Sequence, residues 1–206
     1  MPKKLVAVIQ RHGDTDANDM DCYRSRLDPP LNSKGMKQAE DAADNLEQED
    51  LGIERIITSP LLRACTTADI IAEHLELPVE QDRGLLSWAL GFLSGKDKKT
   101  YEPILGFFID NPKETIPDGE SLDEMEQRVY EFFSKEFKND TLTLFVTHTS
   151  NLVTLENLIH GDHAGRPEVG AVSVDTGGTV GIYVDDNGRY STEILFGKSK
   201  PAEFGS

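Results

Sequence analysis

Two arginines and two histidines lie at or shortly after the ends of predicted strands, where their side chains could bind an anion and supply a nucleophile. These residues are Arg11, His12, Arg63 and His148. Ligands of open α/β sheets bind at the carboxyl ends of the strands, so residues from three such ends are expected to face one site. A single arginine or histidine there is more often surface decoration, whereas four at equivalent topological positions indicate an anion-binding site.

These residue types can bind an anion and supply a nucleophile, and phosphoryl transfer is one reaction that requires both. Charge spreads over the equatorial oxygens of the group in transfer, and catalysis consists mainly of positioning and electrostatic stabilisation. The guanidinium groups of Arg11 and Arg63 can each bind two of these oxygens. A histidine nucleophile must be unprotonated at the attacking nitrogen, and neighbouring arginines favour that neutral form. No metal is needed, and we find no dense cluster of Asp and His with ligand spacing.

The elements that must position these side chains alternate along the chain. Three strands are predicted at residues 5–10, 55–58 and 142–147, and three helices at residues 33–48, 59–75 and 150–159. Apolar residues recur at helical spacing in the helices, and the last of these strands is nearly all apolar, as in a buried parallel sheet. Ser59 followed by Pro60 predicts the N-cap and first residue of the second helix.

The C-terminal part is predicted to be a meander. The stretch Thr176-Gly177-Gly178 lies between predicted strands at 170–175 and 179–184 and indicates a hairpin, and a second turn at 185–188 precedes a strand at 190–196. Alternating strands and helices followed by a meander predict an α/β fold. We expect a three-layer sandwich, in which helices cover both faces of a mixed, mostly parallel sheet.

A single domain is predicted over residues 1–201, and the chain of 206 residues is long enough to give it a substantial core. Residues 76–140 are expected to form an inserted segment that caps one edge of the sheet. This segment ends in a helix predicted at 122–138, whose start at Ser121-x-x-Glu124 fits a capping box. Residues 202–206 carry no pattern and are expected to be a cloning remnant or a disordered tail.

The composition excludes several classes of partner. A net charge of −16 disfavours nucleic acid and anionic membrane surfaces, because phosphate groups require a basic surface. No apolar run approaches the roughly 20 residues of a membrane span. The two cysteines form neither a disulfide framework nor a CxxC metal site, so a cytoplasmic protein is expected. The expected partner is a phosphorylated small molecule, without a cofactor, and the oligomeric state does not follow from the sequence.

The motifs around the four residues resemble those of the histidine phosphatase superfamily, also called the phosphoglycerate-mutase-like family. The stretches that carry the resemblance are Arg11-His12-Gly13-Asp14-Thr15 with Asn18, Thr58-Ser59-Pro60-Leu61-Leu62-Arg63-Ala64, Pro117-Asp118-Gly119-Glu120-Ser121 with Arg128, and Val146-Thr147-His148. They follow the family's order across nearly the whole chain. The resemblance implies the fold described above and a phosphatase that works without a metal.

The resemblance also implies roles for individual residues. His12 would be the nucleophile and become phosphorylated, while Arg11, Arg63 and His148 would bind the phosphoryl oxygens. Asn18 corresponds to a further phosphate contact of the family. The other candidates for phosphate or substrate binding are Thr15, Thr149, Tyr23, Arg24 and Glu120. Among these, Thr15 could equally stabilise the turn. Tyr23 and Arg24 could line the mouth of the site together with Arg26, although arginines on a loop more often lie in solvent.

One part of the family pattern is missing. Members usually carry a glutamate that protonates the leaving oxygen and then activates water, and Ser87 stands at the corresponding place in GLLSWALGFLSG. Asp14, Asp118 or Glu120 could replace it. General acid–base catalysis typically contributes ~10²–10⁴-fold, so we expect low activity or a preference for good leaving groups.

Three functions are compatible with these residues. A phosphatase is favoured, because the nucleophile and all the phosphate-binding residues are retained. A phosphoglycerate-type mutase is less favoured, because the family's mutases carry more inserted chain around the site. The third is a catalytically impaired protein that binds phosphorylated ligands or a protein partner. The discriminating observation is whether His12 accepts phosphate.

Overall fold

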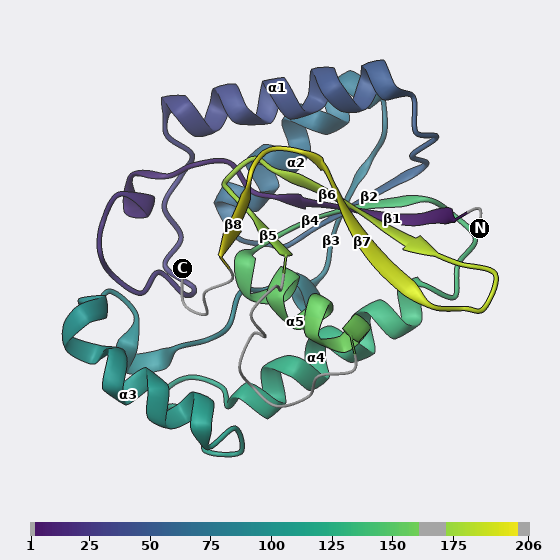
Figure 1. Ribbon diagram of the computed structural model, residues 1–206. Helices are drawn as coiled ribbons and strands as arrows, with labels where there is room; N and C mark the ends of the chain where they lie inside the picture. Colours follow the sequence, from purple (N-terminus) through teal and green to yellow (C-terminus); the bar gives the residue numbers. More distant parts are fainter. Residues whose placement is uncertain (1–2, 161–171, 202–206) are drawn as a thin grey trace.

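Six strands form one mixed sheet in the described part of the chain, which comprises residues 3–160 and 172–201 of this computed structural model (Figure 1). The strand order is β3-β2-β4-β1-β6-β7. The strands are β1 (Lys4–Arg11), β2 (Arg55–Thr58), β3 (Val79–Gln81), β4 (Thr143–Thr147), β6 (Thr179–Val184) and β7 (Tyr190–Phe196). The first four pair in parallel, and β6 and β7 run antiparallel to their neighbours. The predicted mixed, mostly parallel sheet is confirmed.

Helices cover both faces of the sheet, as predicted (Figure 1). One layer consists of α1 (Ser33–Glu49) and α2 (Leu62–Leu75), and the other of α4 (Leu122–Glu136) and α5 (Thr149–His160). Alternate side chains of each central strand point to opposite layers. Val8 packs in the cluster that contains the α1 and α2 side chains, whereas Ile9 packs with those of α4 and α5. This explains why the central strands are apolar on both faces.

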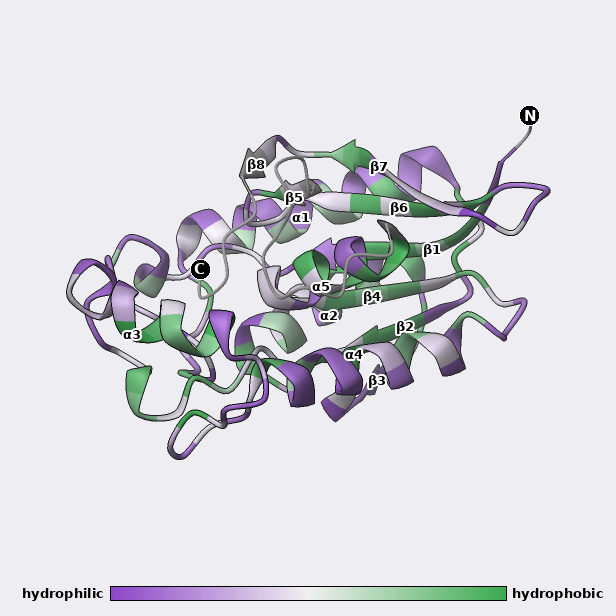
Figure 2. Cartoon of the chain, turned by 60° about the horizontal axis from the view of Figure 1, so that its bottom comes forward, coloured by the Kyte–Doolittle hydropathy of each residue, from purple (hydrophilic) through white to green (hydrophobic). Residues whose placement is uncertain are grey.

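The hydropathy of the elements follows this layering. In Figure 2 the strands β1, β4 and β6 are largely hydrophobic, whereas α1 and α4 carry many hydrophilic residues. The apolar residues of both helices recur at the helical period, so one face packs on the sheet and the other meets solvent. No helix in the described residues has the length and apolar character of a membrane span.

The segment predicted to be an insertion is partly integrated into the sandwich. Its beginning supplies the edge strand β3, and its end supplies α4, which packs on the sheet. The residues between them form the short 3₁₀ helices η2 (Arg83–Leu85) and η3 (Gly91–Leu93) and the helix α3 (Lys98–Asp110). Helix α3 lies beyond the carboxyl ends of the parallel strands, so this middle part covers the edge where the site was predicted (Figure 1).

Two local predictions are wrong. Helix α2 begins at Leu62 and not at Ser59, because the carboxylate of Asp28 accepts a hydrogen bond from the Leu62 N–H at 2.7 Å and thus supplies the cap from another loop. The predicted hairpin around residues 176–178 is not formed either. Strand β5 (Val172–Val174) pairs with β8 (Ser199–Pro201) in a separate two-stranded sheet, and β6 pairs with β1.

The turn at residues 176–178 joins the end of β1. Arg11 N–H donates to Gly178 O at 2.9 Å, and Gly177 N–H donates to His12 O at 3.1 Å. This backbone pairing draws the turn to the carboxyl edge of the sheet. The second predicted turn does form a hairpin, between β6 and β7. Residues 202–206 lie outside the described residues, so their predicted nature is not tested.

Candidate active site

The four residues predicted from the strand ends lie together in the structure. Arg11 ends β1, and His12 follows it beside β4, where the His12 N–H donates to Thr147 O at 3.1 Å. His148 connects β4 to α5, and Arg63 lies in the first turn of α2. The two imidazole rings are 5.2 Å apart between centroids, and all four side chains are buried. Three strand ends thus converge on one site.

His12 is oriented with one ring nitrogen available as a nucleophile. Its Nδ1 lies 2.7 Å from Gly13 O, which can only accept, so the proton is assigned to Nδ1 and the lone pair to Nε2. Arg63 Nε donates to that Nε2 at 3.2 Å. Burial, together with the charges of Arg63 and Arg11, lowers the pKa of His12 well below 6.5. The imidazole is therefore neutral at neutral pH, as attack requires.

Arg63 is fixed by the loop that precedes α1. Its Nη1 donates to Leu27 O at 2.7 Å and its Nη2 to Ser25 O at 3.1 Å. The same Nη2 lies 3.3 Å from His148 Nδ1. Burial lowers the pKa of Arg63 to about 10, which leaves it charged at neutral pH. The guanidinium thus contacts both histidines and holds a fixed positive charge between them.

Arg11 contributes a second buried positive charge. Its Nη1 donates to Val174 O at 2.7 Å, whereas its Nε has no hydrogen-bond partner among the described residues. Burial lowers the pKa of Arg11 to about 10, and the charge of Arg24 adds to this effect. Arg24 is itself buried, with Nη1 3.5 Å from Ala17 O. Three buried arginines in mutual electrostatic contact form a site that favours an anion of high charge density.

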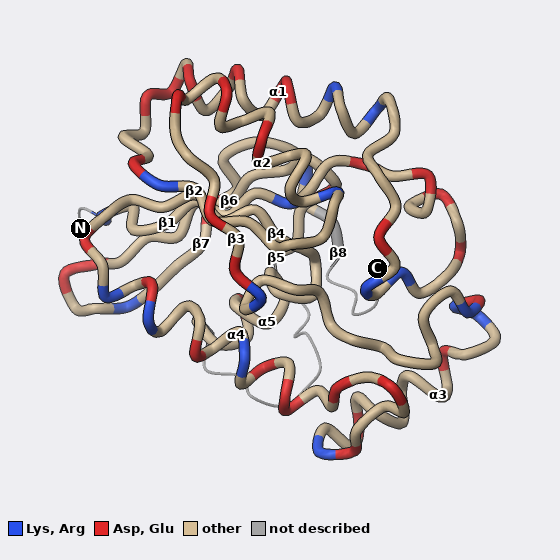
Figure 3. Tube along the Cα trace, turned by 180° about the vertical axis from the view of Figure 1, so that it is seen from behind, with Lys and Arg blue, Asp and Glu red and all other residues tan. Residues whose placement is uncertain are grey.

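This local charge is opposite to that of the chain. The net charge is −16, and Figure 3 shows acidic residues along α1 and the surface loops. Burial protects the arginines from screening by this acidic surface and by salt. An anionic ligand is therefore held by the local field of the site, although the protein as a whole repels it.

Ser59 contacts His148, and the sequence did not identify it as a functional residue. The hydroxyl of Ser59, directly after β2, lies 2.8 Å from His148 Nε2, and both side chains are buried. Burial, followed by the charge of Arg63, lowers the pKa of His148 well below 6.5. We predicted Ser59 to be a helix cap, and its position at a strand end is the signal that could have indicated this second use.

Replacing Ser59 by alanine is expected to lower kcat/KM for p-nitrophenyl phosphate by about tenfold. The variant leaves His148 Nε2 buried without its partner, which costs ~1–3 kcal/mol. Steady-state kinetics would measure the loss. Ser191→Ala in β7 is the matched control, because the Ser191 hydroxyl is buried and has no partner among the described residues. Equal kcat/KM in the two variants would contradict a role for Ser59.

Three further predicted phosphate contacts lie close in sequence to His12 or His148, after β1 and at the start of α5. Asn18 Oδ1 accepts from Thr15 N–H at 3.0 Å and from its hydroxyl at 2.7 Å, across the 3₁₀ helix η1 (Asp16–Asn18). This pair therefore stabilises the turn after β1. Thr149 begins α5 next to His148, and its buried hydroxyl has no hydrogen-bond partner within the described residues. It remains a candidate donor to an anion.

Tyr23 and Glu120 are engaged in contacts within the protein. Tyr23 is buried in the core and its hydroxyl lies 3.4 Å from Lys98 O, so the structure does not place it at the mouth of the site. Glu120 accepts from Arg26 at 3.0 Å, from Arg128 at 2.7 Å and from Ala89 N–H at 2.9 Å. The contacts of Glu120 link the loop before α4 to Arg128 of α4 and to Arg26. Because both side chains are engaged within the protein, neither Tyr23 nor Glu120 is favoured as a substrate-binding residue.

Two of the three carboxylates that could replace the acid expected at position 87 are engaged in other contacts. Ser87 is buried, with its hydroxyl 3.4 Å from that of Ser150. Besides Glu120, Asp14 is also engaged, because it accepts from Asn32 and Lys34 at the start of α1 and from Thr176 in the turn before β6. Asp118 is exposed. The position where the resemblance leads us to expect a glutamate thus carries a hydroxyl group close to that of Ser150.

Comparisons with known proteins identify the family and the fold of the chain. A sequence model of the histidine phosphatase superfamily (branch 1) matches residues 7–190. The 2,3-bisphosphoglycerate-dependent phosphoglycerate mutase of Parvibaculum lavamentivorans is 28% identical over 200 residues, which cover 91% of this chain and 93% of that protein. Phosphoserine phosphatase 1 of Hydrogenobacter thermophilus is 34% identical over 157 residues, which cover 71% of each chain. A solved mycobacterial glucosyl-3-phosphoglycerate phosphatase has a TM-score of 0.77 at 21% identity, with 93% of this chain and 98% of that chain covered.

Proposed function

The chain belongs to the histidine phosphatase superfamily, branch 1, and we propose that it is a metal-independent phosphatase that hydrolyses phosphomonoesters through a phosphohistidine on His12. One observation carries this proposal: the buried, neutral His12 directs its Nε2 lone pair at Arg63 Nε, where a phosphate oxygen would bind. The nucleophile and the positive charge that it needs are therefore adjacent. The substrate is proposed to be a phosphorylated small molecule.

The first step of this reaction forms the phosphoenzyme. Substrate binding replaces the hydrogen bond from Arg63 to His12 by bonds from Arg63 to phosphoryl oxygens, which frees the lone pair. His12 Nε2 then attacks phosphorus, the P–N bond forms, and the bond from phosphorus to the leaving oxygen breaks. Arg11, Arg63 and His148 stabilise the charge on the equatorial oxygens. The leaving oxygen takes its proton from solvent, because Ser87 offers no carboxylic acid.

The second step regenerates the enzyme. Water attacks the phosphohistidine, the P–N bond breaks, inorganic phosphate leaves, and the electron pair returns to His12 Nε2. A carboxylate that removes the proton from water would accelerate this step, and Ser87 does not supply one. We therefore expect the phosphoenzyme to accumulate during turnover.

The rate of phosphoenzyme formation is expected to depend steeply on the pKa of the leaving group. An alkoxide that leaves without a proton is poorly stabilised, whereas a nitrophenolate leaves readily. Single-turnover kinetics with a series of aryl and alkyl phosphates would measure this dependence. Equal rates for aryl and alkyl esters would show that another acid donates a proton, and would contradict our account of Ser87.

The same experiments distinguish a phosphatase from two other functions. A mutase, as one relative is named, would transfer the phosphoryl group from His12 to an added phosphorylated acceptor faster than to water. A phosphate-binding protein would form no phosphoenzyme and release no product. A cytoplasmic location and the absence of nucleic acid or membrane partners remain predictions from the composition.

A further inference from the structure

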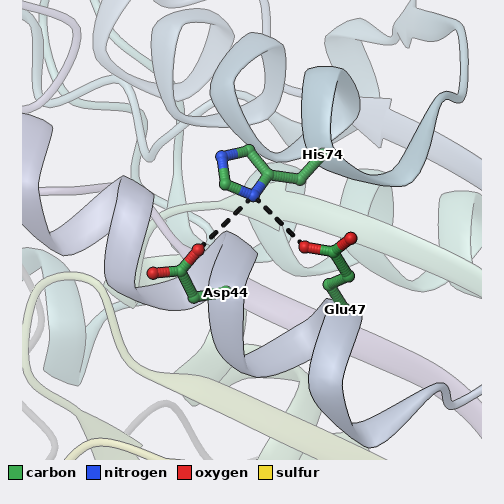
Figure 4. Close-up of side chains that lie close together, drawn as sticks. All are labelled: Asp44, Glu47 and His74. Atoms are coloured by element: carbon green, nitrogen blue, oxygen red, sulfur yellow. Dashed lines mark ion pairs between the residues drawn. The ribbon is translucent and has the colours of Figure 1, made fainter.

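A histidine outside the site lies among carboxylates where α1 packs on α2 (Figure 4). His74, in the last turn of α2, has Nδ1 3.5 Å from Asp44 Oδ1 and 3.6 Å from Glu47 Oε2. Its other ring nitrogen, Nε2, lies 3.2 Å from Glu40 Oε2. All three carboxylates come from α1. Arg63 lies about 16 Å away along α2, at 1.5 Å per residue, so this cluster is separate from the proposed active site.

The spacing around Nδ1 fits a shared metal ion better than hydrogen bonds. An N–H···O hydrogen bond has a donor–acceptor distance of about 2.7–3.2 Å, which is shorter than both Nδ1 distances. Two ligand atoms on a tetrahedral zinc ion, each about 2.0–2.2 Å from the metal, are roughly 3.4 Å apart. One ligand atom from each of Asp44, Glu47 and His74 lies within 4.8 Å of the other two.

The contact at Nε2 supports the same interpretation. Metal-bound histidines almost always donate their second ring N–H to a carboxylate or carbonyl, which fixes the tautomer. If Nε2–H donates to Glu40, the lone pair of Nδ1 faces the two carboxylate oxygens. Three electron-rich atoms then lie within 4.8 Å of one another, and a cation between them would relieve their repulsion.

We propose that Asp44, Glu47 and His74 bind a divalent ion of the zinc type and so link α1 to α2, with Glu40 as the positioning residue for the imidazole. One imidazole and two carboxylates favour zinc over magnesium or calcium, which prefer oxygen ligands alone. The two carboxylates balance the charge of the ion. Asp44 and Glu47 are exposed, so the fourth position is open to a water molecule.

Isothermal titration calorimetry and thermal unfolding of the full chain with zinc chloride would test the proposal. Zinc should bind with one equivalent that requires His74, and at a concentration 100-fold above its dissociation constant should raise Tm by about 5–10 °C. His74→Ala should abolish both effects at that equivalent, Asp44→Asn should weaken binding at least tenfold, and Glu40→Gln should weaken it about tenfold. Asp41→Asn, on the same helix, should bind like the wild type.

Two results would overturn the proposal. The first is the absence of zinc binding by the wild-type chain. The second is zinc binding or stabilisation that is unchanged in His74→Ala, which would place the ion elsewhere in the chain. Thermal unfolding without zinc shows whether each variant folds. None of these measurements depends on phosphatase activity, so they are independent of the function proposed for His12.

Discussion

Replacing His12 by alanine is expected to abolish phosphoenzyme formation and to lower kcat/KM for p-nitrophenyl phosphate by about 10⁴-fold or more, as loss of a covalent nucleophile does in other enzymes. The arginines would still bind the phosphate. His148 also contacts Arg63, but its Nε2 is engaged with the Ser59 hydroxyl, so we do not expect it to replace the nucleophile. Rapid quenching followed by intact-mass spectrometry would show the phosphorylated species. The sample must be kept out of acid, because phosphohistidine is acid-labile.

His12→Asn provides a second variant for the same test. The asparagine amide can replace the Nδ1–H donor to Gly13 O, so it keeps this contact while removing the nucleophile. It should be as inactive as His12→Ala. Phosphorylation of either variant would show that another residue is the nucleophile. A wild-type chain that neither becomes phosphorylated nor releases nitrophenol would instead support a phosphate-binding protein.

Replacing Ser87 by glutamate is expected to increase the hydrolysis of alkyl phosphates by ~10²–10⁴-fold, the usual contribution of a general acid and base. Aryl phosphates should gain much less in phosphoenzyme formation, because their leaving groups need no proton. The buried position next to Ser150 gives the new carboxyl group an environment that favours its protonated form. Single-turnover and steady-state rates would separate the effects on the two steps.

Ser87→Gln is the matched control for this substitution. Glutamine has the size and polarity of glutamate but neither donates a proton to an alkoxide nor accepts one from water. If Ser87→Glu and Ser87→Gln hydrolyse alkyl phosphates at equal rates, a side chain at position 87 does not donate a proton to the leaving oxygen. The missing acid would then not explain the substrate preference that we propose.

Local patterns predicted most of the sandwich because its elements have strong internal periodicity. Strand β2 was predicted with its observed bounds, and α1 within one residue, because each is bounded by a change in hydropathy and turn residues. The pairing of β5 with β8 could not be predicted. The turn composition of residues 176–178 fits both the predicted hairpin and the observed connection between two sheets. Hydrogen bonds to Arg11 and His12, which are distant in sequence, favour the observed connection.

In the sites, too, local patterns predicted some features, whereas contacts between distant residues could not be predicted. The sequence predicted which four residues converge, because topology alone places strand ends at one edge. The sequence did not predict that Ser59 contacts His148, or that Arg63 donates hydrogen bonds to Leu27 O and Ser25 O. These contacts depend on the paths of the loops. It also found no metal-ligand pattern at Asp44, Glu47 and His74, because the ligands lie on two different helices.

The dependence of the site on the last part of the chain has a consequence for biosynthesis. Arg11 donates its side-chain hydrogen bond to Val174 O, and the β1 end pairs with residues 177 and 178. The ribosome must therefore synthesise residues 174–178 before Arg11 and His12 acquire these partners. We expect the nascent chain to be inert toward phosphate esters until residues 174–178 have left the exit tunnel, so that synthesis itself delays the onset of catalysis.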